Sequence, residues 1–331
     1  MTRGRHNVLV SSAGRRVSLL EHFRESIAAL GTGGRVLATD ISMFSSAFHR
    51  ADEAFLVPRC TSDEFVPKLL ALCDAHDVGL VVPTIDTELA ALAAAREQFL
   101  AIGTTVAVSG PATVAIGADK VATNAWLVEG GFPTVRQSDV ASVLADPGAW
   151  SFPVVAKPSA GSASIGVHVV ESADELQPLE AAAGYVVEER ATGDELSIDV
   201  LVGASGAVRD AVVRRRIEVR GGEVSKGVTV RDPEVIALAV SLGEALPDAY
   251  GVLTVQLFLD PIDRTMRVIE INPRFGGGFP LAWQAGARFP QWMLEELEGV
   301  PSTCTPAAWR DGLVMLRYDD AVFVDSSDLE R

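Results

Sequence analysis

The chain has 331 residues, of which 48% are hydrophobic and 22% charged, as is usual for a soluble globular enzyme with two or three domains. Its net charge of −16 argues against a general nucleic-acid binder, which would carry a basic patch. The three cysteines are widely spaced and follow no disulfide or zinc pattern. No signal-like region or membrane-length apolar run is present, so we expect a cytoplasmic protein that binds neither membrane nor nucleic acid.

The first 110 residues alternate between strand and helix patterns. Apolar runs at 7–10, 35–40, 80–84 and 105–108 predict strands, and residues 17–30, 65–75 and 87–100 predict helices. This alternation predicts a parallel, doubly wound sheet. The first turn holds Gly14 but no G-x-G-x-x-G fingerprint, which leaves a nicotinamide oxidoreductase as a distant alternative.

Arg15 and Arg16 stand at the predicted start of the first helix. Cations are unfavourable there because the helix dipole is positive at its N-terminus, so the pair indicates a bound anion unless both side chains simply face solvent. Ligands of open α/β sheets bind beyond the carboxyl ends of the strands. The residues expected on this substrate-facing rim are Ser11, Arg15, Asp40, Thr84 and Asp86.

A run of small residues follows a predicted strand that ends in Lys157. The loop spans residues 158–166, and residues 167–170 form a returning strand. Backbone N–H groups of such a loop can close over polyphosphate oxygens, and the lysine adds a point charge. The alternative is an ordinary flexible hairpin tip. Upstream, a helical pattern over 114–128 contains Lys120, which is either a phosphate ligand or a solvated surface lysine.

An acidic segment and a basic segment follow. Residues 185–188 form a strand that enters the acidic stretch 188–195, either a hinge or an acidic surface turn, and residues 196–202 form the next strand. In this acidic protein the cluster 214–226 is unusually cationic. Arg214, Arg216 and Lys226 are candidates for holding a phosphate, an acyl phosphate or a carboxylate, because such groups bind oxyanions. A charged edge strand is the alternative.

Residues 252–259 and 266–271 read as an antiparallel hairpin with a turn near Asp263. This register places Gln256 opposite Glu270, with Asn272 on the same face, while Ile269 and Ile271 share the other face with Val255 and Leu257. Oxygen ligands of this kind bind Mg²⁺ together with substrate phosphates, although a solvated strand face would look similar. A helix at 235–246, helical core residues Trp283, Trp292, Met293 and Leu297, and a strand at 313–324 complete the chain.

Gln256 followed by Glu270-x-Asn272-Pro273-Arg274 resembles the metal-binding strands of the ATP-grasp superfamily, in its branch of carboxylate–amine ligases similar to the carbamoyl-phosphate synthase large subunit. The resemblance implies an N-terminal parallel-sheet domain (1–110), a lid (111–188) and a C-terminal ATP-grasp subdomain with the metal site (189–331). It also implies a role for each candidate. Arg274, Arg214, Arg216 and Lys226 would be catalytic; Lys120, Lys157, Ser159, Gly161, Ser162, Ser164, Gly166, Glu188, Glu189, Ala191 and Glu195 would bind ATP; Gln256, Glu270 and Asn272 would bind Mg²⁺ or Mn²⁺.

Enzymes of this branch phosphorylate a carboxylate with ATP and let an amine or a similar nucleophile displace the phosphate. The resemblance therefore implies small-molecule carboxylate and amine substrates, and it makes a homodimer an option. Two alternatives stay open at this point: a kinase-like or bicarbonate-activating ATP-grasp enzyme, and an ATP-binding sensor without catalysis.

Overall fold

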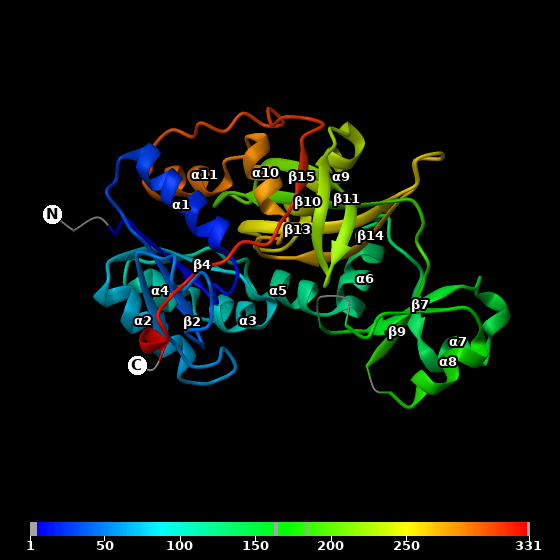
Figure 1. Cartoon of the computed structure of the whole chain (residues 1–331). Helices are drawn as coiled ribbons and strands as arrows, with labels where there is room; N and C mark the ends of the chain where they lie inside the picture. The colour runs from blue at the N-terminus through cyan, green and yellow to red at the C-terminus, as the bar shows by residue number, and fades with distance from the viewer. Residues whose placement is uncertain (1–4, 162–164, 183, 330–331) are drawn as a thin grey trace.

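The computed structural model describes residues 5–161, 165–182 and 184–329, which form three parts (Figure 1). A five-stranded sheet with its helices makes up the N-terminal part, a four-stranded sheet makes up a protruding part, and a six-stranded sheet lies between them. Within these residues, no helix combines the length and apolar character needed to cross a membrane.

The N-terminal sheet is parallel throughout, with the strand order β3-β2-β1-β4-β5, and this confirms the predicted doubly wound sheet. Its central strand is buried on both faces, as expected of a parallel strand covered by helices on each side. The elements are β1 (Asn7–Ser11), α1 (Val17–Leu30), β2 (Val36–Asp40), β3 (Glu53–Leu56), α2 (Phe65–Ala75), β4 (Val78–Pro83), α3 (Asp86–Ala94), α4 (Arg96–Ala101) and β5 (Thr105–Val106).

Two features of this domain differ from the prediction. Strand β3 was not predicted, because it is a short edge strand without a continuous apolar run. The single helix expected at 87–100 is two helices, since the backbone leaves the helical conformation at Ala95 (φ −99°, ψ 2°).

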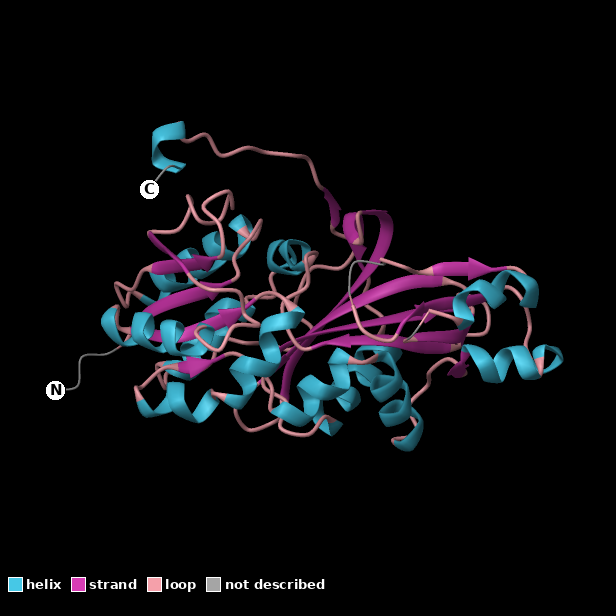
Figure 2. Cartoon of the chain, turned by 90° about the horizontal axis from the view of Figure 1, so that it is seen from below, coloured by secondary structure: helices cyan, strands magenta, loops and turns pink. Residues whose placement is uncertain are grey.

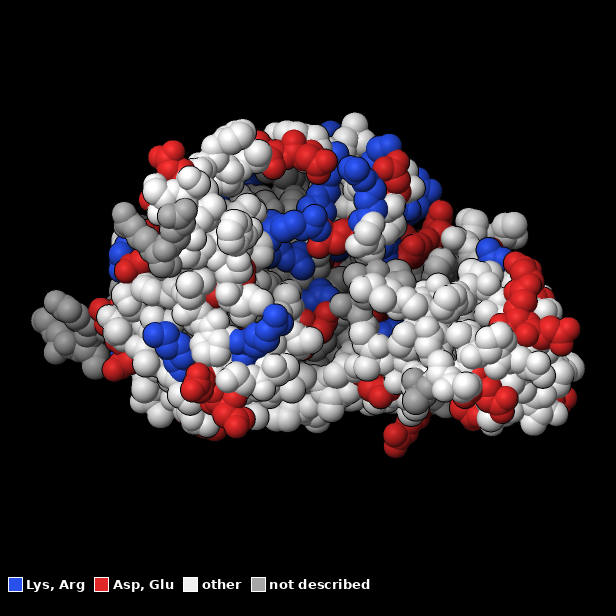
Figure 3. All heavy atoms as spheres, turned by 60° about the horizontal axis from the view of Figure 1, so that its bottom comes forward, with Lys and Arg blue, Asp and Glu red and all other residues white. Residues whose placement is uncertain are grey.

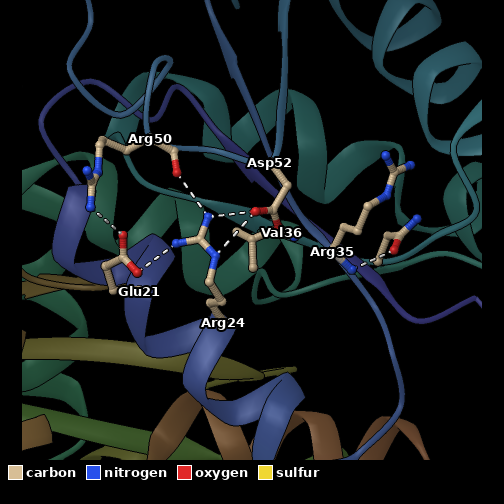
Figure 4. A network of polar contacts seen from close by, with 7 residues as sticks. Glu21, Arg24, Arg35, Val36, Arg50 and Asp52 are labelled. Atoms are coloured by element: carbon tan, nitrogen blue, oxygen red, sulfur yellow. Dashed lines mark hydrogen bonds and ion pairs between the residues drawn. The ribbon is translucent and has the colours of Figure 1, made fainter. Parts of the chain in front are cut away.

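A polar network fixes the edge strand β3 beside helix α1 (Figure 4). The guanidinium of Arg24 on α1 donates to Glu21 (2.6 Å), to Asp52 (2.9 Å) and to the carbonyl of Arg50 (2.9 Å). Asp52 in turn accepts the backbone N–H of Val36 at the start of β2 (2.7 Å). The connection between β2 and β3 is therefore held by charge-assisted hydrogen bonds in addition to the packing of the buried Ala47.

The protruding part is an antiparallel sheet with the strand order β6-β9-β7-β8. Its strands β7 and β8 flank the loop that follows Lys157, as predicted, and the buried Val154 and Leu176 belong to its own small core. The elements are β6 (Gln137–Asp139), α7 (Val140–Ala145), η1 (Pro147–Ala149), β7 (Val154–Pro158), β8 (His168–Val170), α8 (Ala173–Glu180) and β9 (Tyr185–Glu189).

The six-stranded sheet has the order β14-β13-β10-β11-β12-β15, and its neighbouring strands are antiparallel. Helices α5 and α6 pack against β14 of this sheet. The lid predicted over residues 111–188 stays a prediction. The elements are α5 (Pro111–Ala118), α6 (Lys120–Glu129), β10 (Asp194–Val202), β11 (Val208–Arg220), β12 (Glu223–Thr229), α9 (Pro233–Ala245), β13 (Gly251–Leu259), β14 (Met266–Asn272), α10 (Phe279–Ala285), α11 (Phe289–Leu297), β15 (Val314–Leu316) and η2 (Ser326–Leu329).

Two further predictions were wrong in this region. The helix expected at 114–128 is interrupted at Asp119, whose carboxylate caps α6 by accepting the N–H groups of Val121 and Ala122. The strand expected at 313–324 is reduced to β15. The N–H of Arg317 still donates to the carbonyl of Ser225 (3.0 Å), but residues 318–324 belong to no strand, and Tyr318 and Phe323 are exposed. Figure 2 shows this C-terminal segment extending away from the rest of the molecule.

One apolar core joins the N-terminal domain to the C-terminal helices. Phe23 of α1 and Val8 of β1 belong to the same buried cluster as Trp283 of α10 and Trp292 of α11. The predicted core role of Trp283, Trp292 and Met293 is confirmed, and Leu297 packs at the edge of this cluster. This shared core fixes the start of α1 against the six-stranded sheet, where the cavities described below lie.

A buried carboxylate on β11 makes the stability of the fold depend on pH. Asp210 accepts the backbone N–H groups of Ala211 and Ala307, both at 2.9 Å, while its second oxygen has no partner among the described residues. Burial raises the pKa of Asp210 to about 6.

The folded protein therefore holds this proton more tightly than the unfolded chain does, and stability should fall as the pH rises from about 4 to about 6. We expect Asp210→Asn, which cannot ionise, to be about 1–2 kcal/mol more stable than the wild type at pH 7 and to lose this advantage near pH 4. Urea unfolding of both proteins at the two pH values measures the difference. An equal difference at both pH values would contradict the assignment.

Candidate active site

A cavity of about 830 Å³ lies where the small sheet, the six-stranded sheet and the end of β4 meet. Figure 3 shows a hollow in the surface with Lys and Arg side chains gathered around it. Most of the predicted site residues line this cavity. They are Lys120, Lys157, Gly161, Glu188, Glu189, Ala191, Glu195, Arg214, Arg216, Gln256, Glu270, Asn272 and Arg274.

Three predicted residues within the described part of the chain do not line this cavity. The ammonium of Lys226 lies 2.6 Å from Glu218 on an exposed part of the β11–β12 hairpin, so the structure does not support its predicted catalytic role. Ser159 and Gly166 belong to the loop but do not line the cavity. Ser162 and Ser164 lie outside the described residues.

The predicted register of the β13–β14 hairpin is correct at the end that carries Gln256, Glu270 and Asn272. Gln256 on β13 pairs with Glu270 on β14, and Thr254 pairs with Asn272. A bulge after Gln256 shifts the pairing, so that Leu257 faces Val268 instead of Ile269. The prediction that Ile269 shares the buried face of Ile271 is therefore wrong, and Ile269 lines the cavity beside Glu270.

The oxygen atoms on this hairpin fit a hard cation that also binds phosphate. Among the described residues, no group of three or more His, Cys, Asp and Glu side chains could hold a metal ion by itself. The hairpin offers one carboxylate, from Glu270, and the amide oxygens of Gln256 and Asn272. Mg²⁺ is usually bound by one or two carboxylates together with substrate phosphates, so this donor set suits a cation that arrives with a nucleotide.

Two lysines contact the small sheet and its loop. The ammonium of Lys157 lies 2.7 Å from the carboxylate of Glu188, and both side chains are less than 10% exposed. Glu188 therefore lies inside strand β9 and is buried, whereas the sequence suggested an acidic hinge or surface turn. Lys120 donates from its ammonium to the carbonyl of Gly161 (2.9 Å), which places α6 against the loop.

Arg214 is held by a buried carboxylate that the sequence analysis did not identify. Its Nε and Nη2 donate to the two oxygens of Asp199 on β10, at 2.6 and 2.9 Å, and both side chains are almost fully buried. A bidentate pair of this kind fixes the plane of the guanidinium. The signal in the sequence was a single acid, Asp199, within the apolar strand that precedes the arginine-rich segment.

Two other arginines connect separate elements around the cavity. Arg216 forms an ion pair with Glu195 and donates to the amide oxygen of Gln256 (3.3 Å). Arg274 forms a two-point ion pair with Asp86 at the start of α3, with both N–O distances at 2.8 Å, and donates to Asn272 (3.3 Å). Arg274 therefore connects the β13–β14 hairpin to the N-terminal domain.

Only some of the residues predicted for the substrate-facing rim of the N-terminal domain lie there. Thr84 and Asp86 line the large cavity. Ser11 is buried and donates to Glu88 (2.6 Å), and Asp40 accepts the N–H of Gly14 (2.9 Å), so these two side chains support the fold. Arg15 lines a smaller neighbouring cavity.

Gly278 leaves the space that the guanidinium of Arg214 occupies. A Cβ at this position would overlap with Nη1 of Arg214, although the backbone of Gly278 (φ −88°, ψ 0°) would accept an alanine. We expect Gly278→Ala to displace Arg214 and to lower kcat by about tenfold or more, because a small displacement of a positioning group is costly to catalysis. Gly148→Ala, at a site with free space, is the matched control for steady-state ATP turnover. Equal turnover in both variants would show that the position of Arg214 is unimportant.

The comparisons with known proteins agree with this architecture. Residues 8–107 match the family described as PylC-like, N-terminal domain, and residues 117–278 match the family described as ATP-grasp domain. No curated protein shows significant sequence similarity to the chain.

Solved structures share the fold at low sequence identity. The biotin carboxylase domain of 2-oxoglutarate carboxylase from Hydrogenobacter thermophilus, a dimer in complex with MgADP, ADP and bicarbonate, has a TM-score of 0.72 and 17% identity, covering 93% of this chain and 73% of that one. Biotin carboxylase from Campylobacter jejuni has a TM-score of 0.69 and 15% identity over 89% of this chain and 72% of that one. N5-carboxyaminoimidazole ribonucleotide synthetase from Thermotoga maritima has a TM-score of 0.65 and 19% identity over 90% of this chain and 77% of that one.

The two matched domains follow one another along most of the chain, and the cavity between them holds the residues expected from the sequence. The chain therefore belongs to the ATP-grasp superfamily, with a parallel-sheet domain preceding its ATP-grasp domain.

Proposed function

We propose that this protein is an ATP-dependent ligase that activates a small carboxylate as an acyl phosphate and joins it to an amine, with release of ADP and phosphate. The observation that supports this most strongly is the composition of one cavity. Oxygen donors on β13 and β14, the lysines Lys120 and Lys157, and the arginines Arg214 and Arg274 all face it. Phosphoryl transfer needs positioning and charge neutralisation, and this set of residues provides both.

In the first step, an oxygen of the carboxylate attacks the γ-phosphorus of ATP, the bond to the bridging oxygen breaks, and ADP leaves with the electron pair. Lys157 and Lys120 would hold the nucleotide phosphates, and the loop around Gly161 would keep water from the acyl phosphate. Arg274 and Arg214 would bind the carboxylate and then the acyl phosphate. A bound Mg²⁺, held by Glu270, Asn272 and Gln256, would neutralise phosphate charge.

In the second step, the amine nitrogen bonds to the carbonyl carbon, the carbon–oxygen bond to phosphate breaks, and phosphate leaves with the electron pair while the nitrogen releases a proton. The nucleoside would lie against the end of β9 and the start of β10, with Glu189 and Ala191 near the base and Glu195 near the ribose. Because Glu195 is paired with Arg216, ribose binding would compete with that ion pair. The proposed enzyme forms a homodimer and is located in the cytoplasm.

Bicarbonate is a second candidate for the carboxylate. One of the similar structures contains bicarbonate together with MgADP, and an arginine-lined cavity suits this anion as well as an organic acid. An organic acid should stimulate ATP consumption if the first candidate is right, and bicarbonate should do so if the second is right.

The first experiment is ATP-dependent hydroxamate formation, with hydroxylamine in place of the unknown amine, across a panel of carboxylates that includes amino acids. A signal with one acid would demonstrate an acyl phosphate and identify that substrate. ADP release that depends on bicarbonate, without a hydroxamate signal from any acid, would favour the second candidate. MgATP binding without ADP release under either condition would contradict both and favour a sensor.

A further inference from the structure

A second cavity of about 270 Å³ lies beside the large one, at the start of α1. Its volume corresponds to about nine water molecules at about 30 Å³ each, which suits a small metabolite better than a nucleotide. The residues that line both cavities, and so form the wall between them, are Arg16, Thr84, Ile85, Glu223, Gly276 and Gly277.

Three arginines surround one carboxylate in this second cavity. Glu223, at the start of β12, lies 3.1 Å from Arg317 and 3.3 Å from Arg15, and Arg16 is also close to it. Burial alone would raise the pKa of Glu223, but the arginines hold it below its ordinary value, so Glu223 is ionised. The cluster therefore has two positive charges in excess, next to a helix N-terminus that itself favours an anion.

One residue that lines the cavity, His22, has a buried polar atom without a partner among the described residues. His22 on α1 is 5% exposed, and its ring stacks on Trp283 with 4.5 Å between the centroids. Its Nδ1 makes no hydrogen bond to any described residue. Burial, together with the nearby Arg288, lowers the pKa of His22 to about 3, so the ring is neutral at physiological pH. A buried polar atom of this kind is costly unless a ligand group pairs with it.

We infer that the second cavity binds the amine substrate and that this substrate is a zwitterionic amino acid. Its carboxylate lies among Arg15, Arg16 and Arg317, its amino group lies beside Glu223, and its side chain reaches toward Nδ1 of His22. A simple anion would satisfy the arginines but would leave the ionised Glu223 facing it, whereas an amino acid matches both charges. The inference rests on the proposed ligase function and adds the class of its nucleophile.

The position of Glu223 gives the amino group access to the reaction. Because this side chain lines both cavities, an amine held beside it faces the large cavity across Gly276 and Gly277. A Cβ on Gly277 would lie 2.9 Å from the Glu223 carboxylate and 3.2 Å from a guanidinium nitrogen of Arg16, so the absence of a side chain lets both groups lie against the backbone at this wall. Arg274, beside which the acyl phosphate would form, lines the same large cavity as Glu223.

Calorimetric titration of the full chain tests the charge requirement. The probes are L-alanine, L-serine, L-asparagine and L-ornithine, each compared with propionate and n-propylamine, in the presence of MgADP. We expect at least one amino acid to bind about tenfold or more tightly than either single-charge analogue, because each loses one charge-assisted contact. Binding of propionate as tight as that of every amino acid, or no binding by any amino acid, would overturn the inference.

Two variants test the location of the site. Arg317→Gln should weaken amino-acid binding by about tenfold, and His22→Phe, which keeps the ring stacked on Trp283, should weaken binding of those amino acids whose side chain carries a polar group. Arg220→Gln is the matched control, because Arg220 is exposed on the same hairpin as the cluster and lines neither cavity. Equal affinities in Arg317→Gln and Arg220→Gln would place the amino acid elsewhere.

Failure of the inference can be separated from failure of the proposed ligase function. Under the inference, Arg317→Gln raises the KM of the amino acid, whereas Arg220→Gln changes neither this KM nor the hydroxamate reaction with hydroxylamine. An intact hydroxamate reaction without amino-acid binding would contradict the inference alone. Loss of the hydroxamate reaction in the wild type would contradict the ligase function itself.

Discussion

Glu270→Gln should lower kcat by about a hundredfold to a thousandfold, the cost of removing one group that stabilises developing charge in a transition state. Glu270 contributes the single carboxylate of the Gln256–Glu270–Asn272 patch, and glutamine has the same shape without the charge. Nucleotide binding by the variant should also depend less on Mg²⁺, because a neutral amide is a weaker ligand for a hard cation.

The fold of this variant should be unaffected. Glu270 is partly exposed at the wall of the cavity, and substitutions away from a packed core usually change stability by less than about 0.5 kcal/mol. Glu129→Gln, at an exposed position of α6, is the matched control. ATP turnover and calorimetric titration of nucleotide with and without Mg²⁺ measure the two effects. Normal ATP consumption by Glu270→Gln would exclude the metal assignment.

Asp199→Ala should destabilise the protein by about 3–5 kcal/mol, because it leaves the guanidinium of Arg214 buried without a counter-ion. The comparison is Asp194→Ala, which breaks the pair between Asp194 and Arg215 on the same two strands. Both of those side chains are more than 40% exposed, so the expected loss is below about 1 kcal/mol. Urea unfolding of both variants gives the difference.

A double variant separates stability from catalysis. Asp199→Leu combined with Arg214→Met replaces the buried pair by apolar side chains, which is often neutral for stability. We expect this protein to recover most of the stability lost by Asp199→Ala but to remain inactive, since Arg214 lines the proposed carboxylate site. An active double variant would show that Arg214 only supports the fold, and a loss below about 1 kcal/mol in Asp199→Ala would show that the pair is not buried as described.

Local patterns in the sequence determined most of the elements. Helices α1 and α2 begin and end where the apolar periodicity predicted them, because each buries one face against a neighbouring sheet. The pairing of Gln256 with Glu270 also followed from the sequence, since a turn near Asp263 places the two residues opposite each other and keeps the neighbouring apolar residues on one face. The resemblance to the ATP-grasp superfamily was confirmed, and it placed most site residues around one cavity.

Where the prediction failed, the deciding interactions lie between distant segments or in single residues. Strand β3 forms because β2 offers a free edge and Asp52 holds the connection, neither of which a local pattern reveals. The bulge after Gln256 moves Ile269 to the cavity wall, and Asp119 interrupts a helix by capping the next one. The segment after β15 has strand-like residues but no partner strand among the described residues.

The sequence by itself determined the superfamily, the order of the domains and the chemical character of the site, because short motifs and strand periodicity are local properties of the chain. The tertiary structure decided which charges meet. It paired Arg214 with Asp199, Lys157 with Glu188 and Arg274 with Asp86, and it enclosed Glu223 between arginines from distant parts of the chain. These pairs depend on burial and on contacts between remote segments, so the substrate cavities exist only once the sheets and the N-terminal domain have packed together.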